Sequence, residues 1–276
     1  MKRIYVTMAA IAAAVTGFAQ TDTTKTGTDT LHVGNFMIIK KNKEQTKTTT
    51  TEVHINRKPR KSSSVSTNWW IVDIGFANLR DKTNYGSQDA MNYLQPTSRN
   101  PRPTEGDLKL LPGKTSNVNI WAFMQRVSLA KGYVNLKYGL GLEMFNFRYS
   151  NNIRYTTTPS IIRDSISFSK NKLYAGYASV PLMLNLNTHP GRKKGLSVSA
   201  GVSAGYLIGS RNKQISGERG KEKHRGDLGL EQFRLAYVGE VGIGPVRLFG
   251  SYSMTPLHEK GLEQYPYSIG VRLSNW

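Results

Sequence analysis

The stretch Tyr265-Pro-Tyr-Ser-Ile-Gly-Val-Arg-Leu-Ser-Asn-Trp276 closes the chain and decides its fold class. From Tyr265 to Leu273 every second residue is apolar or aromatic, and most of the residues between them are small or polar. Because successive side chains of a strand point to opposite faces, one face of this strand is apolar and the other is polar. A transmembrane β-barrel needs this pattern in every strand, with lipid outside, a polar lumen inside and aromatic residues at both interfaces.

The beginning of the chain is typical of an exported protein. Met1 is followed by two basic residues, and Ile4 to Val15 is an apolar run rich in alanine. Gly17 and Ala19 are small residues at the two positions that a signal peptidase reads. The run is too short to cross a bilayer as a helix. We therefore expect residues 1–19 to be a secretory signal peptide.

Composition narrows the classes of protein that remain. The chain has 276 residues and no cysteine, which excludes disulfides and a lipid anchor on an N-terminal cysteine. Its mean hydropathy of −0.44 is low, but barrels evade hydropathy scans because lumen residues dilute the lipid-facing ones. The formal charge of +20 would favour nucleic acid in a soluble protein. In an exported protein it favours lipopolysaccharide phosphate or another acidic envelope polymer, and we expect no nucleic-acid partner.

Residues 20–67 form a polar, basic segment ahead of the barrel. Residues 21–30 have low complexity and predict disorder. Two β-like stretches follow, at residues 31–39 and 49–55, and they either pair as a short hairpin or belong to a flexible tail. An isolated hairpin is marginal in water, which favours the flexible tail.

Residues 68–276 contain eight stretches with strand periodicity, at residues 69–80, 116–129, 133–147, 173–187, 196–208, 232–244, 246–257 and 265–276. In the second stretch the register is open, because an apolar set containing Trp121 and Phe123 competes with a set containing Ile120 and Met124. Short links alternate with long ones, which span residues 81–115, 149–172, 211–231 and 258–264.

Alternating link lengths are typical of an up-and-down barrel with short periplasmic turns and long external loops. The expected fold is all-β, an eight-stranded antiparallel up-and-down transmembrane β-barrel with a flexible N-terminal tail in the periplasm. A secreted β-sandwich is the alternative, but it gives no reason for the links to alternate in length.

Three parts of the chain resemble the PorT-like outer-membrane β-barrel proteins: residues 29–41, residues 124–143 and the closing strand. The resemblance implies an eight-stranded barrel in a Gram-negative outer membrane. One member of that family is associated with a protein secretion system, and many have no assigned role. The closing strand also resembles the C-terminal signal read by the barrel-assembly machinery, with Gly270, Leu273 and Trp276 in its key positions.

Charged residues at inward positions form the first candidate site, which comprises Asp73, Lys137, Glu143, Arg234, Glu240, Arg247 and Arg272, with Arg126 if the register allows. An eight-stranded barrel is just wide enough to be filled by side chains. Unpaired buried charge costs several kcal/mol, so these groups are expected to pair and plug the lumen. A gated pore or a proton path is the alternative.

External basic residues form the second candidate site, which comprises Arg211, Lys213, Arg219, Lys221, Lys223 and Arg225. They either clamp lipopolysaccharide phosphates or simply keep the loop soluble. His224 and His258 are expected on the same side, with Asp227 and Ser253 available, but no spacing joins them into a triad. We expect no catalytic residue, no cofactor and no metal site.

These features predict a non-enzymatic outer-membrane barrel that is a structural or accessory component of an envelope or secretion complex. Its expected partners are outer-membrane lipid, lipopolysaccharide, the barrel-assembly machinery and other envelope proteins. A narrow channel is the first alternative, and a surface lipid-modifying enzyme is the second and weaker one.

Overall fold

The computed structural model describes residues 28–33, 36–41, 50–55, 64–156, 160–190, 195–243 and 245–274. It separates into two units, residues 1–62 and residues 63–276. The expected signal peptide of residues 1–19 lies outside the described residues, and so does Trp276 of the expected assembly signal. The described residues contain no helix that is long and apolar enough to cross a membrane.

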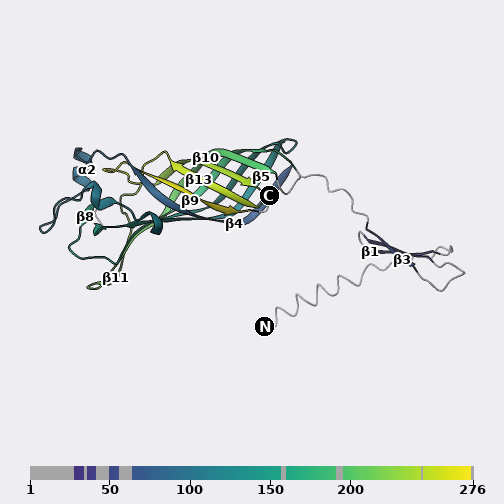
Figure 1. Ribbon diagram of the computed structural model, residues 1–276, viewed down its shortest axis with the longest axis horizontal. Coiled ribbons are helices and arrows are strands. Elements are labelled where there is room, and N and C mark those ends of the chain that lie inside the picture. The colour runs from purple at the N-terminus through teal and green to yellow at the C-terminus, as the bar shows by residue number, and fades with distance from the viewer. Residues whose placement is uncertain are drawn as a thin grey trace. The chain divides into compact units, whose positions relative to one another are not determined.

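The first unit holds a three-stranded antiparallel sheet in the order β1-β2-β3 (Figure 1). Its strands are β1 Thr28–Val33, β2 Phe36–Lys41 and β3 Thr50–Ile55. The β-like stretch at residues 31–39 is therefore parts of two paired strands and not one strand. The two residues between them, Gly34 and Asn35, lie outside the described residues.

The second unit is the barrel. Within the described residues its ring comprises β4 Val65–Asp81, β5 Ser116–Ala130, β6 Val134–Tyr149, β9 Lys170–Asn187, β10 Leu196–Ser216, β12 Phe233–Ile243, β13 Val246–Ser253 and β14 Gln264–Leu273. Each strand pairs antiparallel with its neighbours in the chain, and β14 pairs with β4 to close the ring (Figure 1). The predicted eight-stranded up-and-down barrel is confirmed.

The outer wall of the barrel is apolar. On β10, Leu196, Val198, Val202 and Tyr206 are exposed, whereas the serines between them are buried on the lumen side. The exposed positions continue to Ile208, so the band is about 40 Å long at about 3.3 Å per residue. A strand tilt of about 45° reduces this length to about 28 Å, close to the thickness of the hydrocarbon core.

Aromatic side chains gather at both ends of this apolar band. Trp69, Phe123 and Tyr133 lie at one end, with ring centroids of Trp69 and Phe123 5.9 Å apart. Tyr206 and Phe233 lie at the other end, with their ring centroids 5.2 Å apart. Such belts mark the two interfaces of a bilayer. The second unit is a transmembrane β-barrel.

A bulge settles the register of β5. The pairing of β5 with β6 shifts between Trp121 and Phe123, and opposite this point on β4 Trp70 has a φ of 54°. A left-handed φ is rare for an aromatic residue, and here it places Trp69 and Trp70 side by side on the outer wall, 64% and 73% exposed. Each of the two competing registers is therefore correct for half of β5.

The long links fold into an ordered cap at the end of the barrel opposite the C-terminus (Figure 1). They contain α2 Gln88–Tyr93, η1 Glu105–Leu108, η2 Pro112–Lys114, the hairpin β7 Ile153–Tyr155 with β8 Ile161–Arg163, and β11 Gly220–Arg225. Of these elements, α2, η1 and the β7–β8 hairpin contribute side chains to an apolar cluster that includes Phe147, Tyr155, Leu173 and Leu228. The link expected at residues 211–231 is largely a β10–β11 hairpin, because β10 continues to Ser216.

Candidate functional site

The seven charged residues expected in the lumen are all buried, and none is more than 5% exposed. They come from five strands. On each strand the residues directly before and after the charged one face outward, so the charged side chain faces the lumen. Arg126 is half-buried on β5. The seven residues separate into a larger group around Glu240 and a smaller one around Glu143.

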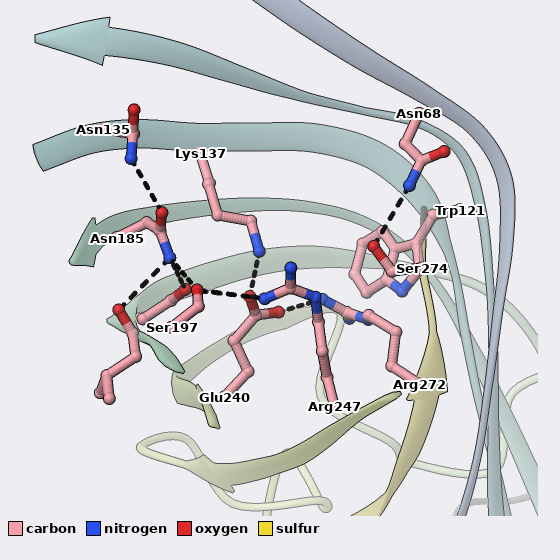
Figure 2. Close-up of polar contacts among 12 residues, drawn as sticks. Asn68, Trp121, Asn135, Lys137, Asn185, Ser197, Glu240, Arg247, Arg272 and Ser274 are labelled. Atoms are coloured by element: carbon pink, nitrogen blue, oxygen red, sulfur yellow. Dashed lines mark hydrogen bonds and ion pairs between the residues drawn. The ribbon is translucent and has the colours of Figure 1, made fainter. Parts of the chain in front are cut away.

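Glu240 is the centre of the larger group (Figure 2). Its Oε1 atom accepts hydrogen bonds from the Lys137 ammonium, from Nη1 of Arg247 at 3.4 Å and from the Ser199 hydroxyl at 2.9 Å. Its Oε2 atom accepts from Nη1 of Arg272 at 2.7 Å. One carboxylate therefore serves three cations that come from three strands. Lys137 lies on β6, which is not a sheet neighbour of β12, so this ion pair crosses the lumen.

Asp73 and Arg272 connect this group to the seam of the barrel. They are directly opposite each other on β4 and β14, the strands that close the ring. Nε and Nη2 of Arg272 each donate to Asp73 at 2.7 Å, a bidentate geometry that is strong and specific. The indole N–H of Trp121 also donates to Asp73 at 2.7 Å. The larger group thus holds two carboxylates against three cations.

Glu143 and Arg234 form the second group, nearer the cap. Arg234 donates to Glu143 through Nη1 and to the Ser251 hydroxyl at 3.3 Å through Nη2. Its guanidinium lies 4.8 Å from the ring centroid of Phe145. Phe145 begins the apolar cluster below the cap, so this pair lies where the lumen changes from polar to aromatic. The sequence indicated the charges but not this boundary, although the run Phe145, Phe147, Tyr149 continues the inward period of β6.

Small polar side chains complete the network at the opposite end. Asn135 donates to Asn185 at 3.0 Å, and Asn185 donates to the hydroxyls of Ser197 at 2.7 Å and Ser199 at 2.9 Å (Figure 2). Arg247 donates to Ser197 at 3.2 Å, which joins this chain to the charges. In the sequence, the asparagine and serine residues at inward strand positions were the pattern that could have predicted this polar network.

Side chains fill the middle of the lumen. A small pocket between the two charge groups measures about 20 Å³ and is lined by residues that include Trp121, Glu143, Met183, Glu240 and Arg272. That volume holds about one water molecule. The arrangement closes the barrel and keeps its charges paired.

No triad forms among His224, His258, Asp227 and Ser253, which bond to other groups. His258 is buried in the cap, where its Nε2 lies 2.9 Å from the Tyr155 hydroxyl. Burial lowers the pKa of His258 to about 3, so its imidazole is neutral at physiological pH. The Ser253 hydroxyl donates to a backbone carbonyl, Asp227 accepts from a backbone N–H, and His224 lies 3.9 Å from Glu222. The described residues contain no cluster that could hold a metal ion.

No protein-family model matches the chain, and no curated protein matches it. Among solved structures, the crystal structure of Ail, the attachment invasion locus protein of Yersinia pestis, aligns with 75% of this chain and 99% of Ail, at 14% identity and a TM-score of 0.27. The crystal structure of Ail in complex with the heparin analogue sucrose octasulfate aligns with 74% of this chain and 97% of Ail, at the same identity and TM-score. The assignment as a barrel rests on the closed ring of strands and its apolar outer wall.

Proposed function

We propose that this protein is a non-conducting, non-enzymatic barrel of a Gram-negative outer membrane, and that it serves as a structural or accessory component of an envelope complex. The observation that carries the proposal is the filled lumen, in which Glu240 satisfies three cations at once. A solute path would require these groups to separate inside the membrane, and each uncompensated buried charge costs several kcal/mol.

The proposal places the segment of residues 20–67 in the periplasm. An even number of strands puts both ends of a barrel on one side of the membrane, and the short links lie on that side. The three-stranded sheet of β1, β2 and β3 then becomes a periplasmic module available to a partner, while the barrel-assembly machinery inserts the barrel itself.

The two alternative functions find less support. A narrow channel would use the same lumen charges, but the network leaves little room between them. A lipid-modifying enzyme would need an activated nucleophile near the outer surface. His258 is enclosed by the cap, where Tyr155 stacks against it, with 5.9 Å between the ring centroids.

Planar-bilayer recording tests the proposal directly. The purified full-length barrel is expected to give no steady single-channel openings, because the lumen is packed from the Asn185 level to Phe145. The variant Val241→Ala changes only the lipid-facing surface, so it serves as a control and is also expected to give no single-channel openings. Regular openings of defined conductance from the wild-type protein would contradict a non-conducting role and favour the channel.

A further inference from the structure

Part of the barrel sheet continues beyond the bilayer. β6, β9 and β10 extend past the apolar band, and β11 adds a fourth strand at the edge of β10. On the inner face of this extension, Asn171, Asn212 and Gln214 are buried and bonded to one another or to backbone. The opposite face points away from the barrel axis.

The outer face of this extension carries eight cations, which we call the basic face: Arg148, Lys170, Lys172, Arg211, Lys213, Lys221, Lys223 and Arg225. Its central row crosses all four strands, since Arg148 pairs with Lys172, Lys172 with Lys213, and Lys213 with Lys223. Neighbouring strands are about 4.8 Å apart. A row below it pairs Arg211 with Arg225, and a row above it places Ile215 between Lys170 and Lys221.

No carboxylate lies on the basic face among the described residues. Glu222 pairs in register with Gln214, whose side chain is on the inner face. Asp164 binds Arg219 at 3.0 Å and Arg154 at 3.7 Å, so Arg219 does not belong to the basic face that its sequence position suggested. Like charges directly opposite each other destabilise a sheet.

The crowding of cations affects their protonation. The pKa of Lys172 is lowered by partial burial and then by Lys170, Arg211, Lys213 and Arg148. An anion bound at the central row would remove this repulsion. The arrangement is costly when empty and favourable when occupied by negative charge, which points to a binding surface.

The basic face begins at the membrane interface. Arg211 stacks on Tyr174, with 4.8 Å between its guanidinium carbon and the ring centroid, and Tyr206 marks the aromatic belt on the same strand. Successive rows are two residues apart, about 7 Å along the strand and about 5 Å in height at a tilt of about 45°. Because the rows also run across tilted strands, the basic face presents positive charge at several heights, the lowest of them at the level of the headgroups.

We propose that the basic face binds the phosphorylated sugar headgroup of a glycolipid in the outer leaflet, which in this membrane is lipopolysaccharide. The proposal rests on the outer-membrane location proposed above. A membrane-anchored headgroup with several phosphates matches charge at several heights beside the bilayer, whereas a free phosphate ion would occupy one row only. Arg148, Lys170 and Lys172 join the site, although their positions outside the 211–225 hairpin hid them in the sequence.

Binding of lipopolysaccharide to purified barrels tests this site. The row variant combines Lys172→Gln, Lys213→Gln and Lys223→Gln, and the matched control combines Lys82→Gln, Lys109→Gln and Lys260→Gln, three exposed external lysines. We expect the row variant to bind at least about tenfold more weakly, because three charge-assisted contacts are lost. We expect the control to bind within about twofold of wild type. Enzymatically dephosphorylated lipopolysaccharide should bind wild type as weakly as intact lipopolysaccharide binds the row variant.

Three outcomes would overturn the site. Equal losses in the row variant and the control would mean that overall net charge attracts the lipid. Undiminished binding of the dephosphorylated lipid would mean that the basic face does not recognise phosphate. Full displacement by inorganic phosphate at millimolar concentration would identify a free-anion site. The single variant Lys213→Gln repeats the comparison if the triple variant folds poorly, and bilayer recording is independent of all these results, so failure here leaves the closed barrel standing.

Discussion

Replacing Glu240 by alanine is expected to destabilise the barrel by about 3 to 5 kcal/mol. The carboxylate compensates Lys137, Arg247 and Arg272 in the lumen, and removing one partner of a buried ion pair leaves charge without compensation. Urea unfolding in lipid vesicles measures the change. The lipid-facing control Val271→Ala removes two methyl groups from a surface that acyl chains already cover, so its cost should be about 1 kcal/mol or less.

A second variant separates lost charge from lost shape. Glu240→Gln keeps the size of the side chain but leaves three cations against one carboxylate, and it should destabilise nearly as much as alanine. Adding Lys137→Met restores the original excess of one cation and should recover part of the stability. If Glu240→Ala were silent and Val271→Ala severe, the inward and outward faces would be reversed.

Replacing Gly270 by alanine is expected to cost about 3 kcal/mol or more and to lower the yield of folded barrel. Gly270 lies opposite Gly75 at the seam between β14 and β4. A Cβ atom on Gly270 would approach the Cα atom of Gly75 to 2.5 Å and the ring of Phe249 to 2.7 Å. Backbone cannot yield there without separating the first and last strands, and overpacking of this kind is strongly destabilising.

Gly250→Ala is the matched control for the seam. Gly250 lies on the adjacent β13, and a Cβ there meets only the carbonyl oxygen of Ser268, at 3.6 Å. Refolding from urea into lipid vesicles, followed by gel mobility with and without heating, measures the folded fraction. This assay uses no assembly machinery, so it isolates packing from any role of Gly270 in an assembly signal. Equal folded fractions for the two variants would contradict the packing argument.

The barrel was predictable from the sequence because apolar and polar residues alternate along its strands. A residue such as Arg272 between Val271 and Leu273 must face the lumen if its neighbours face lipid, and the same reasoning placed Asp73, Glu143 and Glu240. Strand order followed from the links, so the closeness of Glu240, Arg247 and Arg272 on consecutive strands was also predictable.

Contacts that depend on how strands face one another across the lumen were not predictable. Lys137 reaches Glu240 from a strand that is not its sheet neighbour, a relation set by the size and tilt of the whole ring. The bulges in β5 and near Ile208 of β10 depend on pairing with adjacent strands. The core of the cap joins residues as distant as Tyr93 and Leu228, whose links carry no periodicity.

Cysteine labelling tests the central claim, a transmembrane barrel whose lumen is closed, most directly. The chain has no native cysteine, so single variants report one position each. Ser203 is fully buried on the lumen side of β10, Val202 faces outward beside it, and Ser98 is exposed in the long link between β4 and β5, which the proposed topology places outside the cell. Each is replaced by cysteine, as Ser203→Cys, Val202→Cys and Ser98→Cys, and intact cells are treated with a charged, water-soluble maleimide.

With the charged maleimide, only Ser98→Cys should react on intact cells. With a lipid-soluble maleimide, Val202→Cys should react as well. Ser203→Cys should resist both reagents until the barrel is unfolded. Reaction of Ser203→Cys with the charged reagent as fast as Ser98→Cys would mean that water fills the lumen, and it would contradict the closed barrel.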